Sequence, residues 1–68
     1  MKLKWERNTY APIPDYNSTD NRWRIYRHMP GDWRLQDRNS PNHPTPILYT
    51  FSLAQAKAEA EYRKEQVR

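Results

Sequence analysis

Arginine residues recur at alternate positions in two neighbouring segments of the chain, and they are the side chains best suited to binding chemistry. Every second residue of a strand points to the same face, so pairing these segments in a hairpin would gather the arginines on one surface. An arginine fork binds phosphate or a guanine edge through two hydrogen bonds, glutamine suits adenine, and tyrosine can stack on a base. The predicted nucleic-acid or partner-binding residues are Arg22, Arg24, Tyr26, Arg34, Gln36 and Arg38.

Three interpretations of this predicted arginine face stay open. Like charges on facing strands repel, so an anionic partner would stabilise the arrangement. That partner is either nucleic acid or an acidic protein surface, unless the face is simply solvated, as one face of an antiparallel sheet commonly is. The chain has 12 Lys and Arg against 8 Asp and Glu, a formal net charge of +4, which mildly favours anionic partners.

The sequence offers little for catalysis. It contains no cysteine, one glycine and two histidines, so a cysteine nucleophile and a glycine-rich phosphate loop are both excluded. A metal site would have to combine His28 and His43 with Asp32 or Asp37, and histidines in or beside turns are usually solvated. We therefore predict no enzymatic activity, no catalytic residue, no metal and no cofactor.

Two aromatic residues offer an alternative site for a protein partner. Trp5 lies on a short N-terminal strand that is a candidate edge strand, and Tyr62 belongs to a second helical stripe opposite the one predicted to be buried. Interfaces without chemistry are commonly anchored by aromatic and arginine side chains. Trp23 and Trp33, in contrast, alternate with polar residues on the central strands, and we expect both in the core.

The elements that must position these residues form one small domain over residues 1–68. Alternating patterns predict strands at 3–7 and 47–51 and a hairpin at 22–38, while loops are predicted at 8–21 and 39–46 because proline and asparagine are frequent there. An alanine-rich segment without Gly or Pro predicts a helix at 53–66. The predicted fold class is α+β, with a three- or four-stranded antiparallel sheet packed against one C-terminal helix.

The register of the hairpin follows from parity. Trp23 and Ile25 share a face with Trp33 and Leu35 if the numbers of paired residues add to an even value. We therefore expect an odd-numbered loop of three or five residues around Pro30-Gly31.

The start of the helix is also predicted. Ser52 can cap the first turn, with Gln55 reaching back in a capping box and Phe51 packing on Ala56 as a hydrophobic staple. A narrow stripe of small and apolar residues should face the sheet: Leu53, Ala56 and Ala60.

The longest apolar run is Ile47-Leu48-Tyr49, so we expect neither a membrane span nor a signal peptide, and no membrane partner. The absence of cysteine fits a reducing cytosol. An unpaired edge at residues 3–7 allows a homodimer through that strand as well as a monomer.

The order of Lys4-Trp5-Glu6-Arg7, Trp23-Arg24-Ile25, Trp33-Arg34-Leu35 and the segment 50–61 resembles short products of bacteriophages, especially those infecting actinobacteria. That resemblance implies a small ββ(β)α protein of the host cytoplasm. The passage from Tyr49-Thr50-Phe51 into the helix is also similar to the arm-type DNA-binding domain of tyrosine integrases, which implies DNA reading by Arg24, Arg34 and Gln36. Two functions are thus expected: a phage accessory protein that binds DNA, or a phage inhibitor that binds a host protein.

Overall fold

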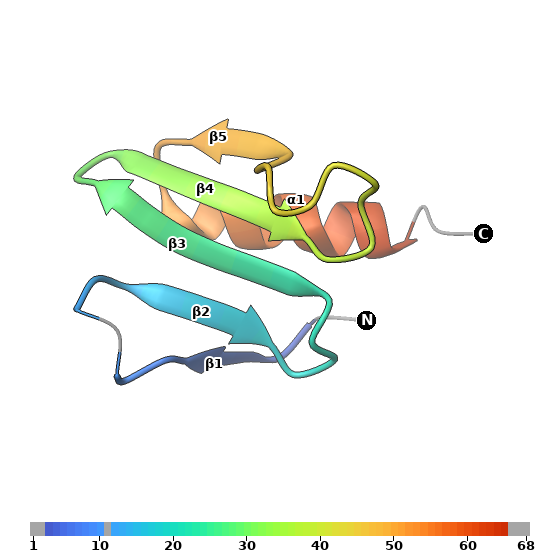
Figure 1. Cartoon of the computed structure of the whole chain (residues 1–68), viewed down its shortest axis with the longest axis horizontal. Helices are drawn as coiled ribbons and strands as arrows, with labels where there is room; N and C mark the ends of the chain where they lie inside the picture. Colours follow the sequence, from blue (N-terminus) through green and yellow to red (C-terminus); the bar gives the residue numbers. More distant parts are fainter. Residues whose placement is uncertain (1–2, 11, 66–68) are drawn as a thin grey trace.

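The chain forms a five-stranded sheet with one helix on one of its faces (Figure 1). The computed structural model describes residues 3–10 and 12–65. The strands follow one another in chain order, and every neighbouring pair is antiparallel. The α+β prediction is therefore confirmed, with five strands where three or four were expected. The elements are β1 Trp5–Arg7, β2 Asp15–Ser18, β3 Trp23–Met29, β4 Asp32–Asp37, β5 Leu48–Thr50 and α1 Leu53–Glu65.

The strand that the sequence did not predict is β2, which lies inside the predicted loop 8–21. The two prolines of that segment precede the strand, so they remove no hydrogen bond from it. Tyr16 pairs with Ile25 of β3 and with Arg7 of β1. Because β2 is paired along both sides, pairing overrides the low strand propensity of its Asp and Asn residues.

The even register predicted for the hairpin is confirmed, although the turn differs from the expected one. Ile25 lies opposite Leu35 and Arg27 opposite Trp33. The pairing then shifts between Arg27 and Met29, so that Met29 pairs with Asp32. A bulge and a two-residue turn together thus replace the odd-numbered loop. Gly31 closes that turn at a φ of 78°, a conformation that favours glycine.

The core lies between the helix and strands β3 to β5. Trp23, Ile25 and Leu35 are completely buried there, as are Ala56 and Ala60 of the helix. The predicted stripe is therefore confirmed, with Leu53 packed at its margin. Alanine at these positions lets the helix lie close to a sheet that carries large side chains.

The helix begins where the sequence predicted. The backbone N–H of Gln55 donates to Oγ of Ser52 over 3.2 Å, which confirms the cap. The side chain of Gln55 does not return to Ser52 and accepts a hydrogen bond from Thr50 over 2.6 Å instead. Phe51 is 84% exposed, so the staple prediction is wrong. The helix is described to Glu65, and residue 66 of the predicted helix lies outside the described residues.

Candidate binding surfaces

Four of the six predicted binding residues meet on the face of the sheet opposite the helix. Arg24 lies opposite Gln36, and Tyr26 lies opposite Arg34 on the next pair of positions. Tyr49 of β5 lies opposite Arg34 and extends the same face. We call these five residues the arginine face.

Arg24 is held by an ion pair from the neighbouring strand. Its Nε and Nη2 atoms donate to the two carboxylate oxygens of Asp15, each over 3.0 Å. A third hydrogen bond of 3.3 Å joins Nη1 to the side-chain oxygen of Gln36. The guanidinium carbon lies 4.7 Å from the centre of the Tyr26 ring. Asp15 is only 4% exposed. The guanidinium group of Arg24, which was predicted to bind a phosphate, is therefore already bound to a buried carboxylate.

Arg34 has the same kind of environment. It donates to both carboxylate oxygens of Asp32, over 3.3 and 3.1 Å, and its guanidinium carbon lies 4.9 Å from the centre of the Tyr49 ring. The hydrogen bonds that Arg34 donates to Asp32 are the main reason that the pKa of Arg34 is raised. The spacing of Asp32 and Arg34 in the sequence is compatible with this ion pair, because residues two apart on a strand share a face.

The segment that follows β4 covers part of the arginine face. Gln36 is 6% exposed, and its side-chain nitrogen donates to the backbone oxygen of Pro44 over 2.6 Å. In Figure 1 this segment, between β4 and β5, lies in front of the sheet while the helix lies behind it. The amide of Gln36 is therefore engaged within the protein, where a base edge was expected.

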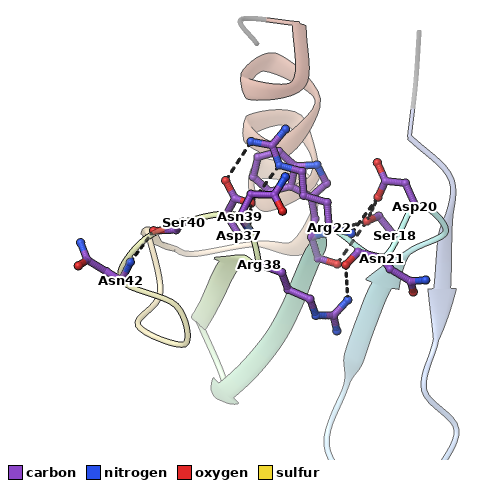
Figure 2. Close-up of polar contacts among 10 residues, drawn as sticks. Ser18, Asp20, Asn21, Arg22, Asp37, Arg38, Asn39, Ser40 and Asn42 are labelled. Carbon is purple, nitrogen blue, oxygen red and sulfur yellow. Dashed lines mark hydrogen bonds and ion pairs between the residues drawn. The ribbon is translucent and has the colours of Figure 1, made fainter. Parts of the chain in front are cut away.

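The remaining two predicted residues, Arg22 and Arg38, adjoin one another at the end of the β3–β4 hairpin that is farther from its turn (Figure 2). Arg22 donates to the carboxylate of Asp37 over 3.0 and 3.1 Å and stacks over Trp23, close to the helix. Burial acts to raise the pKa of Asp37, but the hydrogen bonds from Arg22 and from the backbone of Asn39 outweigh it and lower that pKa. Arg38 points away from the helix.

Arg38 is tied to the end of the sheet by two short hydrogen bonds. One goes to the backbone oxygen of Asn21 over 2.7 Å and the other to the side-chain oxygen of Asn17 over 2.6 Å. It has no carboxylate partner within the described chain. Of the four arginines predicted to share one face, three are therefore matched by an aspartate each, which leaves the sheet face close to neutral.

The two residues of the alternative site are not neighbours. Trp5 is half-buried and packs against the core from β1. Tyr62 is 60% exposed and shares a hollow with Leu48 and Tyr49. Because β1 and β5 form opposite edges of the sheet, a single partner contact with both residues would have to span its whole width.

Exposed aromatic rings instead gather around β5. Tyr49 is 58% exposed, Phe51 84% and Tyr62 60%, and we call these three residues the aromatic edge. Two open hollows adjoin them. One lies between β5 and the helix and includes Ala58 and Tyr62, and the other lies beside the β3–β4 turn and includes Gly31 and Phe51. The sequence showed Tyr62 as a candidate but gave no sign that Phe51 would leave the core.

Other kinds of site have little support in the described structure. His28 and His43 are both exposed, and residues 3–10 and 12–65 include no group of three or more His, Asp or Glu side chains placed to hold a metal ion. The one helix of these ranges is too short and polar to cross a membrane.

Comparison of the chain with family models, with curated proteins and with solved structures found no match.

Proposed function

We propose that this chain is a non-catalytic binding protein that holds an extended segment of a protein partner at the aromatic edge. The observation that carries the proposal is the exposure of Tyr49, Phe51 and Tyr62 beside two hollows. Aromatic side chains of this kind supply much of the binding energy of protein interfaces. Three of them on so small a surface favour an interface over a solvated surface.

The backbone of β5 supports an extended partner. Among the described strands β5 pairs with β4 alone, so the N–H and C=O groups along its outer side are available for a further strand. Addition of a strand at a sheet edge gives affinity through main-chain hydrogen bonds and specificity through pockets for alternate side chains. The hollow between β5 and the helix would receive inward side chains of such a segment, against Leu48 and Ala58.

The DNA-binding function expected of the arginine face stays a prediction, and the ion pairs weaken its support. Asp15 and Asp32 already provide the negative charge that phosphates would have provided. Combined with the resemblance to phage products, the proposal makes the partner a protein of the host cytoplasm.

A display library of random 12-residue peptides, selected on the immobilised chain, tests this proposal without knowledge of the partner. We expect enrichment of peptides rich in apolar and β-branched residues. Their binding should fall at least tenfold in the double variant Phe51→Ser/Tyr62→Ser, because it removes two of the three rings.

The matched control replaces two apolar side chains that are exposed elsewhere. Tyr10 is 96% and Ile13 41% exposed, so Tyr10→Ser/Ile13→Ser should leave binding unchanged. The proposal is wrong if no peptide is enriched, or if the selected peptides bind the Phe51→Ser/Tyr62→Ser variant as tightly as the natural chain.

A further inference from the structure

A second group of cations lies on the helix side of the sheet and includes no residue of the arginine face or the aromatic edge. Arg7 of β1 is directly opposite Tyr16 of β2, and the Nζ atom of Lys57 lies 5.3 Å from the centre of the Tyr16 ring. Tyr16 contacts Trp33, with 6.5 Å between ring centres, and Arg27 is the residue opposite Trp33. Lys57 of the helix thus lies on one ring of the pair, and Arg7 and Arg27 are the strand neighbours of the two rings.

Within the described residues these cations have no carboxylate partner, a property that they share with Arg38 and not with the other arginines. Within the described residues, Arg22, Arg24, Arg34 and Arg63 each form an ion pair. None is formed by Arg7, Arg27 or Lys57 in those same parts of the chain. Glu61 follows Lys57 by one helical turn, the spacing of a stabilising pair, yet the ammonium group of Lys57 lies on the ring of Tyr16 instead.

We propose that Arg7, Arg27 and Lys57, the cation cluster, bind the phosphodiester groups of a nucleic acid. The site is distinct from the arginine face, which lies on the opposite side of the sheet, and it includes none of the three rings of the aromatic edge. It also goes beyond the proposed capture of a protein partner. Within the described residues no aspartate or glutamate forms an ion pair with this cluster, as Asp15 and Asp32 do with the arginine face.

Charge and shape both favour phosphates. Three like charges held near one another repel, and an anion between them relieves that repulsion. The rings of Tyr16 and Trp33 are half-buried, so they give the cluster an apolar floor, next to which an ion pair is screened less than in open water. Two arginine forks match phosphate oxygens in geometry as well as in charge.

The test measures binding of the chain to a fluorescently labelled 12-nucleotide single-stranded DNA and to a labelled duplex of the same length. Binding is detected by fluorescence anisotropy. Each phosphate contact contributes a slope of about 0.7 for single strands and about 0.9 for duplex on a plot of log affinity against log salt. Three contacts to a single strand therefore predict a loss of roughly 20-fold between 50 and 200 mM salt. Comparison of the two affinities shows whether the site prefers a single strand or the phosphate spacing of a duplex.

A pair of double variants that lower the net charge equally makes the test specific. Arg7→Gln/Arg27→Gln should bind at least tenfold more weakly than the natural chain and with a shallower salt slope. Arg38→Gln/Arg63→Gln, which removes two charges from other surfaces, should bind within about twofold of it. Phe51→Ser/Tyr62→Ser should also bind DNA normally, which separates this site from the proposed protein site. Urea unfolding of each variant verifies that it is folded.

Several results would overturn the proposal. The cation cluster is not the site if both arginine double variants lose affinity equally, since the attraction is then diffuse. If neither DNA form binds at 50 mM salt, nucleic acid is not the ligand of the cation cluster. A poly-glutamate chain of equal charge that competes as well as DNA would show that the cluster prefers acidic proteins.

Discussion

The arginines on the two faces of the sheet have different partners. On the face away from the helix, Arg24 and Arg34 are each gripped by an aspartate through two hydrogen bonds. On the helix side, Arg7 and Arg27 have no carboxylate partner within the described chain. The face with the more obvious arginine pattern is therefore the less basic one. Net charge and alternation show where arginines gather, but strand neighbours decide which of them remain available.

The largest expected effect comes from the helix side of the hairpin, which carries the stability of the fold. Leu35 is completely buried, and Leu35→Ala should lower the free energy of unfolding by about 2 to 5 kcal/mol. In so small a domain most of the molecules would then be unfolded at 37 °C. Urea unfolding followed by tryptophan fluorescence measures the loss, and a value below about 1 kcal/mol would contradict the assigned core.

An intermediate effect is expected on the arginine face. Asp15→Asn removes the charge that Arg24 contacts, and we expect a loss of about 1 to 2 kcal/mol, less than for a fully buried pair because Arg24 is partly exposed. The double variant Asp15→Asn/Asp32→Asn should also gain DNA affinity in the anisotropy assay, because it frees two arginine forks. An unchanged affinity in a folded double variant would show that ion pairing is not what limits this face.

A smaller effect is expected at the start of the helix, beside the aromatic edge. Ser52→Ala removes the acceptor for the N–H of Gln55 and should cost about 1 kcal/mol in the same urea experiment. Gln55→Ala should cost less, because the side chain of Gln55 bonds to Thr50 on the surface and not to the cap. Equal losses in the two variants would contradict this division of roles.

The smallest effect concerns the pH dependence at the ion pair between Arg22 and Asp37. The pKa of Asp37 is lowered in the folded state, so its stabilisation is present above the unfolded value of about 3.9 and is lost as pH falls through the folded pKa. Asp37→Asn cannot titrate. The stability gap between the natural chain and Asp37→Asn, measured in urea at pH 7 and pH 3, should therefore narrow in acid. A constant gap would be contrary to this prediction.

Local patterns in the sequence were sufficient to predict the helix and the hairpin register. Ser52 followed by an alanine-rich segment marks the helix start, and the alternation of Trp23, Ile25, Trp33 and Leu35 determines which sides of β3 and β4 meet. Both features depend on residues close in the chain. The bulge that produces the register was not predictable, because a bulge and an odd-numbered loop give the same parity.

The candidate sites were less predictable because they depend on β2. Its sequence, Asp15-Tyr16-Asn17-Ser18, has the composition of a loop and becomes a strand only through pairing on both sides. Without β2, the partner of Arg24 and the ring beneath Lys57 could not be placed. Phe51 was missed for a different reason, since its position before the cap fits a staple as well as an exposed ring.

Ion pairs occupy the arginine face, and we propose that a protein partner binds at the aromatic edge. The most direct measurement is a titration of the ¹⁵N-labelled chain with a peptide selected from the display library, followed by amide chemical shifts. We expect the largest changes in β5 and on the adjoining side of the helix, at residues 48–51 and 55–62, with smaller changes at 33–35, which pair with β5, and little change at 24–26. Changes centred on 24–26 would contradict this proposal and place the binding site on the arginine face.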